Sequence, residues 1–166
     1  KDRIVIGFSF EERSVGNKAF QQSFLSKQTD LNTIQTFSFN DLSELKKHVK
    51  KGLLRFPIIS KPLAGSRGRG IFLYKKFDNG IGRHLKGYVF QNFIPNDGDF
   101  RVLVLAGKVI SCYKRVAAKN SFLNNVSQGG RIKFVKDKKR KDEISSIGLR
   151  ASAAFNLIHA GVDVLY

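Results

Sequence analysis

Short apolar runs broken by glycine, proline and asparagine recur along this chain, and they predict strands over much of its length. Two neighbouring runs, 100–105 and 108–113, are separated only by Ala106-Gly107 and are expected to form a hairpin. The other runs have the length of buried strands and are bounded by turn residues. We expect strands at residues 3–10, 33–37, 56–61, 70–74, 88–94, 131–135 and 161–166 in addition to this hairpin.

Three segments instead repeat their apolar residues at helical spacing. The first starts after Gly16-Asn17 and places Phe20 and Phe24 on one face. The second follows Asn40-Asp41, either of which can cap a helix by accepting hydrogen bonds from N–H groups of the first turn. The third covers 144–157, and the charged run 136–141 before it is expected to be a turn.

Composition adds a strong positive charge, with 30 Lys and Arg against 13 Asp and Glu and a formal net charge of +17. This charge favours polyanionic partners such as nucleotides, nucleic acid or an acidic protein tail, although a generally lysine-rich surface explains it equally well. No apolar run reaches the roughly 18 residues of a membrane span. The single cysteine, Cys112, excludes an internal disulfide and a thiolate metal site, and it favours a reducing, cytoplasmic setting.

The segment Lys61–Gly70, with sequence KPLAGSRGRG, joins two of the expected strands. Its glycines leave backbone N–H groups uncovered, so the segment can fold over phosphate oxygens, and Lys61 can add a point charge. No Gly-Lys-Ser/Thr sequence and no helix follow the glycines, which excludes a P-loop. The simpler interpretation is a flexible hairpin tip with two solvated arginines.

Three further groups of residues have both a functional and a plain interpretation. Residues 91–101 form a strand and then a turn with two carboxylates and an arginine, which suits ribose and phosphate or only an ordinary turn. Arg115 and Asn125 can contact a phosphate or a metal, but each is isolated in the sequence. Asp163 is a lone carboxylate in an apolar strand, where its burial is costly unless it is paired or binds a metal. A strand-end turn is the alternative for Asp163.

The order and spacing of these segments resemble the ATP-grasp superfamily, and within it the RimK-type amino-acid ligases that join glutamate to a carboxylate. The resemblance extends from about Asn17 to Tyr166. Residues 56–70 resemble the strand, lysine and phosphate loop of the family. Residues 89–94 resemble its Val-Gln-Glu-Phe-Ile strand, and 99–104 its Asp-Ile-Arg strand. Residues 114–130 resemble the segment with the Arg-Ser-Asn and Gly-Gly signatures, and 160–163 the strand with the first magnesium-binding carboxylate.

The resemblance implies an α+β fold, in which two α+β lobes with antiparallel sheets grip ATP between them. Residues 1–16 would be the end of a preceding domain, 17–87 the first lobe with the phosphate loop, and 88–166 the second lobe. This second lobe is expected to be truncated, because the Glu-x-Asn metal ligands of the family would lie in a strand beyond Tyr166. The strand that carries Asp163 is therefore expected to have an exposed edge.

The resemblance also implies the roles of individual residues. Asp163 would bind Mg²⁺ or Mn²⁺, with the remaining ligands beyond Tyr166. Asn92 departs from the usual Glu, and Leu123 from an arginine, which implies either altered specificity or lost activity. The nucleotide-binding residues would be Lys18, Lys61, Gly65, Ser66, Gly68 and Gly70 at the phosphates, Gln91, Asn92 and Phe93 along the adenine side and Asp99 near the ribose, with Arg101, Arg115 and Asn125 facing the reacting phosphate.

The implied activity is ATP-dependent carboxylate–amine ligation. ATP phosphorylates a carboxylate, and the amine of glutamate or a related amino acid attacks the acyl phosphate to give an amide. The acceptor would be an acidic protein tail or a small molecule; a homo-oligomer is allowed, and neither a membrane nor nucleic acid is expected as a partner. The fragment alone is expected to be inactive. The alternative is a non-catalytic nucleotide- or polyanion-binding module, and the sequence does not fix the acceptor, the amino acid added or whether the fragment folds alone.

Overall fold

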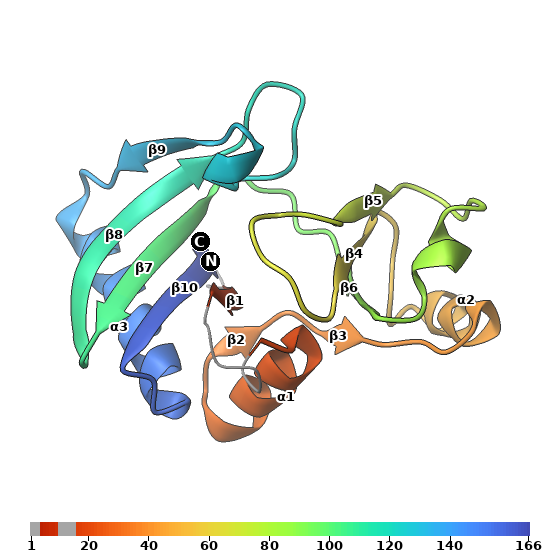
Figure 1. The fold of residues 1–166 in the computed structure, drawn as a ribbon, viewed down its shortest axis with the longest axis horizontal. Helices are drawn as coiled ribbons and strands as arrows, with labels where there is room; N and C mark the ends of the chain where they lie inside the picture. The colour runs from red at the N-terminus through yellow and green to blue at the C-terminus, as the bar shows by residue number, and fades with distance from the viewer. Residues whose placement is uncertain (1–3, 10–15) are drawn as a thin grey trace.

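A computed structural model describes residues 4–9 and 16–166, which form two β-sheets with helices packed against them (Figure 1). The remaining parts of the first expected strand and of the expected preceding domain, residues 1–3 and 10–15, lie outside the described residues. The elements are β1 (Ile4–Ser9), α1 (Lys18–Gln28), β2 (Asn32–Thr33), β3 (Thr36–Phe37), α2 (Leu42–Lys50), β4 (Ile58–Pro62), β5 (Phe72–Tyr74), η1 (Ile81–His84), β6 (Tyr88–Asn92), β7 (Asp99–Leu105), β8 (Lys108–Val116), η2 (Val126–Gln128), β9 (Arg131–Phe134), α3 (Lys138–Ala154) and β10 (His159–Leu165).

The larger sheet has six strands in the order β2-β1-β10-β7-β8-β9, and all of its pairs are antiparallel except β1 with β2. Helix α3 packs on one face and buries Ile144, Ile147 and Ala151 against the sheet. The approach is close: a Cβ on Gly148 would lie 2.5 Å from Cγ1 of Val102. The opposite face of the sheet is thereby left for the smaller lobe (Figure 1).

The smaller sheet has four antiparallel strands in the order β3-β6-β4-β5. Its core contains Phe39, Leu45, Leu54, Ile58 and Phe90. Strand β6 begins at residue 88 but belongs to the smaller sheet. A division of the chain between residues 87 and 88 therefore separates β6 from the other strands of its own sheet. The predicted α+β fold with antiparallel sheets is confirmed, apart from the short parallel pair of β1 and β2 in the larger sheet.

The first two helices begin where the sequence predicts. Asn17 caps α1 by accepting hydrogen bonds from the backbone N–H groups of residues 19 and 20, and Asp41 caps α2 in the same way at residues 43 and 44. Glu44 also accepts from the backbone N–H of Asn40 at 3.1 Å, which closes a reciprocal cap. The buried face of α1 is not the predicted face that contains Phe20, because Phe20 is 47% exposed. Leu25 and two glutamines are buried instead.

Two expectations about the second lobe are wrong. The charged run 136–141 is not a turn, because Asp137 accepts a hydrogen bond from the backbone N–H of Arg140 and starts α3 at Lys138. The edge of β10 is not exposed either, since β1 pairs with it antiparallel over Ile4–Ser9. The expected strand 33–37 is also divided, with β2 in the larger sheet and β3 in the smaller. No helix of the described residues is long and apolar enough to cross a membrane.

Candidate active site

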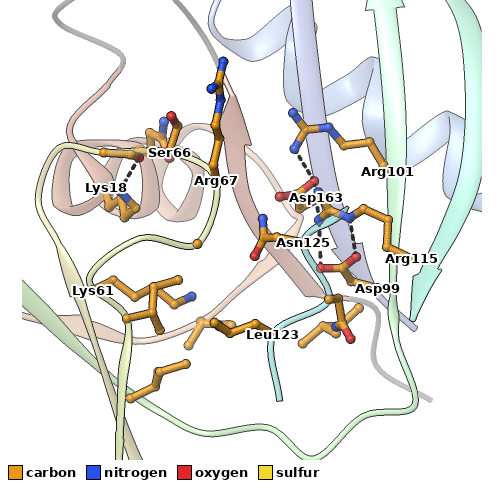
Figure 2. Close-up of a pocket in the computed structure, with 18 of the residues that line it drawn as sticks. Lys18, Lys61, Ser66, Arg67, Asp99, Arg101, Arg115, Leu123, Asn125 and Asp163 are labelled. Carbon is orange, nitrogen blue, oxygen red and sulfur yellow. Dashed lines mark hydrogen bonds and ion pairs between the residues drawn. The ribbon is translucent and has the colours of Figure 1, made fainter. Parts of the chain in front are cut away.

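A cleft of about 1220 Å³ is lined by residues of both sheets and of the loops between them. Every residue that the sequence predicts for the site lines this cleft except Gly70. Figure 2 shows two walls, with Lys18, Lys61 and the glycine-rich loop on one side and a cluster of arginines and aspartates on the other. Asn125 and Leu123 lie between them.

The glycine-rich loop, residues 63–70, connects β4 to β5 as the sequence predicts. Gly65, Gly68 and Gly70 have φ of +139°, +73° and +68°, conformations that side chains rarely adopt. A Cβ on Gly68 would also lie 2.8 Å from Oδ1 of Asn125, so a side chain at this position would force Asn125 to move. A Cβ on Gly70 would lie 2.9 Å from Cγ of Pro62, so Gly70 shapes the loop from outside the cleft.

The two lysines of the first wall hold or face this loop. Lys18, the first residue of α1, donates its backbone N–H to the Leu63 carbonyl at 3.0 Å and its Nζ to the Gly65 carbonyl at 2.9 Å. Burial lowers the pKa of Lys18. Burial and then the charge of Lys18 lower the pKa of Lys61 to about 8, against the opposing pull of two aspartates across the cleft.

A pair of hydrogen bonds ties the loop to the second lobe. The carbonyl oxygen of Arg67 accepts from Oγ of Ser127 at 2.8 Å and from Nε2 of Gln128 at 3.1 Å. Arg67 has a φ of +62°, an uncommon conformation for a residue with a side chain. We refer to these two bonds as the latch. The latch holds the loop over the cleft in the described structure.

The second wall carries a network of two arginines and two aspartates that cross-strand register brings together. Asp99 on β7 is opposite Arg115 on β8, and Arg101 on β7 is opposite Asp163 on β10. Arg115 donates Nε and Nη2 to the two oxygens of Asp99 at 2.7 and 2.8 Å. Oδ1 of Asp163 lies 2.6 Å from Nη1 of Arg101 and 2.9 Å from Nη2 of Arg115. The two arginines therefore share one carboxylate.

Burial and charge act in opposite directions in this network. Burial raises the pKa of Asp99, although the hydrogen bonds from Arg115 oppose the change. Burial also works against the charge of Arg115, but the carboxylates of Asp163 and Asp99 outweigh it and raise its pKa. The guanidinium of Arg115 thus stays charged and fixed in the wall of the cleft.

A glycine on β10 makes room for Arg101. A Cβ on Gly161 would lie 2.5 Å from Nη2 of Arg101, so the guanidinium lies flat against the backbone at this point. Gly161 belongs to the run that the sequence singles out, but only Asp163 is predicted as functional there.

The adenine-side residues are placed by β6. Gln91 donates Nε2 to Oγ1 of Thr36 at 2.7 Å, and its buried Oε1 has no partner among the described residues. Oδ1 of Asn92 accepts from the backbone N–H of Arg55 at 2.7 Å, so this side chain holds a neighbouring loop. Phe93 packs edge-on against the ring of Phe122. The buried Oε1 of Gln91, which lacks a hydrogen-bond partner among the described residues, suits a ligand that donates hydrogen bonds.

The described residues do not by themselves fit a magnesium site. No group of three or more His, Cys, Asp or Glu side chains that could hold a metal occurs among residues 4–9 and 16–166. Asp163 is the predicted ligand, but its Oδ1 is bonded to two arginines. Magnesium takes one or two carboxylates together with phosphates and water, so Asp163 can supply at most part of such a site.

The residues of this cleft lie within a segment that matches a known protein family. The family model of the RimK-like ATP-grasp domain matches residues 16–166. The chain belongs to the RimK-like ATP-grasp family. The match covers the glycine-rich loop, the arginine–aspartate network and the latch.

Named relatives of this RimK-like chain include ligases. It is 33% identical over 117 residues to a probable alpha-L-glutamate ligase of Parasynechococcus marenigrum, covering 66% of this chain and 24% of the relative. It is 27% identical over 156 residues to the coenzyme gamma-F420-2:alpha-L-glutamate ligase of Methanocaldococcus jannaschii, covering 85% and 50%. The chain thus spans half or less of the length of these two relatives.

Solved ATP-grasp structures share the fold of this RimK-like chain. The ATP-grasp ligase PsnB, complexed with a minimal precursor, Mg and ADP, matches with a TM-score of 0.63 and 23% identity, over 89% of this chain and 44% of PsnB. D-alanine–D-alanine ligase from Bacillus anthracis matches with a TM-score of 0.65 and 15% identity, over 89% and 51%. At these identities the likeness shows the fold alone.

Sequence reasoning misses three parts of this RimK-like site. Ser127 and Gln128 are absent from the predicted site, because nothing in a polar loop indicates which distant carbonyl it will meet. Gly161 has a signal that could have found it, because a glycine in the interior of a strand often marks the close approach of another group. The bond between Asp99 and Arg115 is recoverable once the hairpin register is known, since residues directly opposite share a face.

Proposed function

We propose that the intact protein is an ATP-dependent carboxylate–amine ligase that joins an amino acid such as glutamate to the carboxylate of a protein or a small molecule. The observation that carries the proposal is the arrangement of charge across one cleft. Lys18, Lys61 and the loop amides form one wall, and Arg101 and Arg115 form the other. A triphosphate between these walls meets cations from both sides.

In the first step an oxygen of the acceptor carboxylate attacks the γ-phosphorus of ATP, and the bond to the β-phosphate oxygen breaks to release ADP. This step needs positioning and charge neutralisation more than a protein nucleophile. Lys61 and the amides of residues 65–68 would hold the β- and γ-phosphates. Arg115 would face the transferred phosphoryl group, fixed there by its bonds to Asp99.

In the second step the amine attacks the carbonyl carbon of the acyl phosphate. The carbon–nitrogen bond forms, the carbon–oxygen bond to phosphate breaks, and the ammonium proton leaves to solvent or to the departing phosphate. Arg101 and Asn125 would stabilise the negative charge that grows on the carbonyl and phosphate oxygens. The closed latch would keep water from the acyl phosphate, which hydrolysis otherwise destroys.

ATP-grasp ligases use ATP and Mg²⁺, and we propose the same for the intact protein, with Asp163 as one ligand. Since the described residues do not complete a metal site, none of the steps above is assigned to the metal. Asp99 is predicted near the ribose, but both of its oxygens accept from Arg115 and it is only 5% exposed. We therefore propose that Asp99 orients Arg115. A cytoplasmic location agrees with the free thiol of Cys112.

The test is formation of ADP and amide by the intact protein with Mg²⁺, glutamate and a panel of carboxylate acceptors. Lys61→Ala should lower kcat/KM by about 100-fold or more, because it removes one charge-assisted contact to the transferring group. Lys108→Ala is the matched control, since this exposed lysine starts β8 at the hairpin away from the cleft. Equal turnover of the two variants would contradict the role of Lys61, and nucleotide binding without any amide would favour the non-catalytic module.

A further inference from the structure

The outer edge of the larger sheet is formed by β9, Arg131–Phe134, which pairs on one side only among the described residues (Figure 1). All four of its residues are exposed, Phe134 at 89% and Ile132 at 51%. An open sheet edge presents unpaired backbone N–H and C=O groups that can pair with another extended chain. An exposed aromatic residue on such an edge adds apolar surface that water solvates poorly.

The register of β9 against β8 assigns its side chains to two faces. Ile132 is opposite Arg115 and Phe134 is opposite Tyr113, so both apolar side chains share the face of the cleft-lining residues. Lys133 is opposite Lys114 and shares the other face of the sheet, together with Arg131. The edge strand is therefore apolar on the cleft side and basic on the other side.

Positive charge continues past the strand into α3 in a place where it does not help the helix. Three cations, Lys138, Lys139 and Arg140, stand in the first turn of α3, and the only acidic side chain beside them there is the N-cap Asp137. The helix macrodipole disfavours cations at this end of a helix. These exposed cations and Lys136 follow β9 directly in the sequence, with Asp137 among them.

We propose that β9 binds an extended acidic polypeptide segment as an added strand. The backbone of the segment pairs with the free edge of β9, its apolar side chains pack on Ile132 and Phe134, and its acidic side chains face Arg131 and Lys133. A strand of alternating acidic and apolar residues satisfies both faces at once. The α3 cations attract the acidic chain at the end of β9 that lies away from Gly130.

The position of β9 gives this surface a use in the proposed ligase reaction, on which this part of the inference rests. The strand begins directly after Gly130, whose backbone packs against the carbonyls of residues 124 and 125 in the cleft wall. A segment bound along β9 thus runs between the basic start of α3 and the cleft. The bound polypeptide is then the carrier of the acceptor carboxylate.

Two competing roles for this edge strand predict different behaviour. The first role is protection against aggregation, because a lysine on an edge strand discourages pairing between copies of a protein. This role explains Lys133 but does not explain the exposed ring of Phe134. Single-stranded nucleic acid would use the cations and stack a base on Phe134, but a phosphate backbone leaves the edge N–H and C=O groups of β9 unpaired. The open backbone edge therefore favours a polypeptide.

The experiment measures binding of a fluorescent twelve-residue peptide of alternating Glu and Val to the intact protein without ATP. A peptide of the same composition with its Glu and Val in two blocks should bind at least tenfold more weakly, because it cannot place acid on one face and apolar groups on the other. Two further peptides carry N-methyl groups at every second residue, the first at the odd and the second at the even positions. Each of these peptides therefore lacks the backbone N–H donors along one edge of the strand. One of them should lose binding, and the other should keep it.

The protein variants separate this surface from net charge. Lys133→Glu should weaken peptide binding at least tenfold, whereas Lys46→Glu, an equal charge change on the exposed side of α2, should change it less than twofold. Any one of three outcomes would overturn the proposal. The first is an equal loss of peptide affinity in both protein variants, and the second is equal binding of the alternating and block peptides. The third is displacement of the peptide by oligo(dT) together with no effect of N-methylation. Since no ATP is present, failure of the ligase assay leaves the docking result standing, and the reverse also holds.

Discussion

Arg115 and Asp99 face one another across the β7–β8 hairpin and join through two parallel hydrogen bonds of 2.7 and 2.8 Å. Both residues are buried, at 6% and 5% exposure. A bidentate pair of this kind fixes the plane of the guanidinium as well as its position. Arg115 reaches Asp163 with the same Nη2 atom, so the pair also sets the geometry of the residue that is predicted to bind metal.

Removal of Asp99 should leave the buried guanidinium of Arg115 with the shared carboxylate of Asp163 as its remaining charged partner. We expect Asp99→Ala to lower the free energy of unfolding by about 1.5–3 kcal/mol, measured by urea denaturation, because two charge-assisted hydrogen bonds are lost while the contact to Asp163 remains. Asp97→Ala is the control, because Asp97 pairs with Lys114 from a position whose side chain is 88% exposed, and exposed pairs are worth about 0–1 kcal/mol. Similar losses in the two variants would show that the Asp99 pair is not the stabilising feature that its burial indicates.

Nucleotide affinity should depend on the charge of Lys61. Its pKa in the ligand-free protein is lowered from 10.5 to about 8, so the ammonium is present below pH 8 and is lost as the pH rises through 8. We expect the Kd for ADP, measured by calorimetry between pH 6.5 and 9.5, to rise by up to about tenfold per pH unit above 8. Lys61→Arg should remove this dependence because a guanidinium keeps its charge. An unchanged pH profile in that variant would assign the effect to another group.

Loss of the latch should open the glycine-rich loop. Ser127→Ala with Gln128→Ala removes two hydrogen bonds of about 1 kcal/mol each, which raises the open population roughly 30-fold. The loop contains its own reporter, since trypsin cleaves after Arg67 and Arg69, and cleavage of a transiently open segment follows the open population. Cleavage after Arg83 in η1 serves as the internal control and should not change. If cleavage at all three arginines accelerated together, the double variant would be unfolding globally.

A methyl group on Gly161 should displace Arg101 without unfolding the lobe. The nearest atoms to the added Cβ belong to the guanidinium, the far end of a flexible side chain, so the fold can adapt at a cost within about 1 kcal/mol. We expect Gly161→Ala to lower kcat of the intact protein about 10- to 100-fold, since a shift of about 1 Å in a catalytic group can cost this much. Gly82→Ala is the control, because nothing lies within 4 Å of its Cβ position. Full activity of Gly161→Ala would remove Arg101 from the proposed mechanism.

Local signals account for most of the fold that the sequence predicts. Asn17 and Asp41 act as helix caps, Ala106-Gly107 turns the β7–β8 hairpin, and the glycines of residues 63–70 adopt positive φ. In each case a few neighbouring residues determine the conformation, so the sequence contains the necessary information. The start of α3 is missed because the five basic residues around Asp137 hide this cap, which accepts a hydrogen bond from the backbone N–H of Arg140.

The contacts that the sequence does not reveal join segments far apart in the chain. The pairing of β1 with β10 links residues more than 150 positions apart, and a strand carries no local mark of its partner. The cleft residues are predicted from the resemblance, whereas their bonds to one another are not. Asp99 illustrates the difference, since its place in the cleft is predicted but its engagement with Arg115 follows only from the hairpin register.

The latch has its acceptor on the main chain of Arg67 and its donors on side chains of residues 127 and 128. Every amino acid at position 67 brings a carbonyl, so no codon change there deletes the acceptor. The donors are therefore the part of the latch that a substitution can delete, while the side chain at position 67 can be altered without deleting the acceptor, provided that the new residue tolerates a φ of +62°. Specificity and closure can thus be altered at different places, specificity at position 67 and closure at positions 127 and 128.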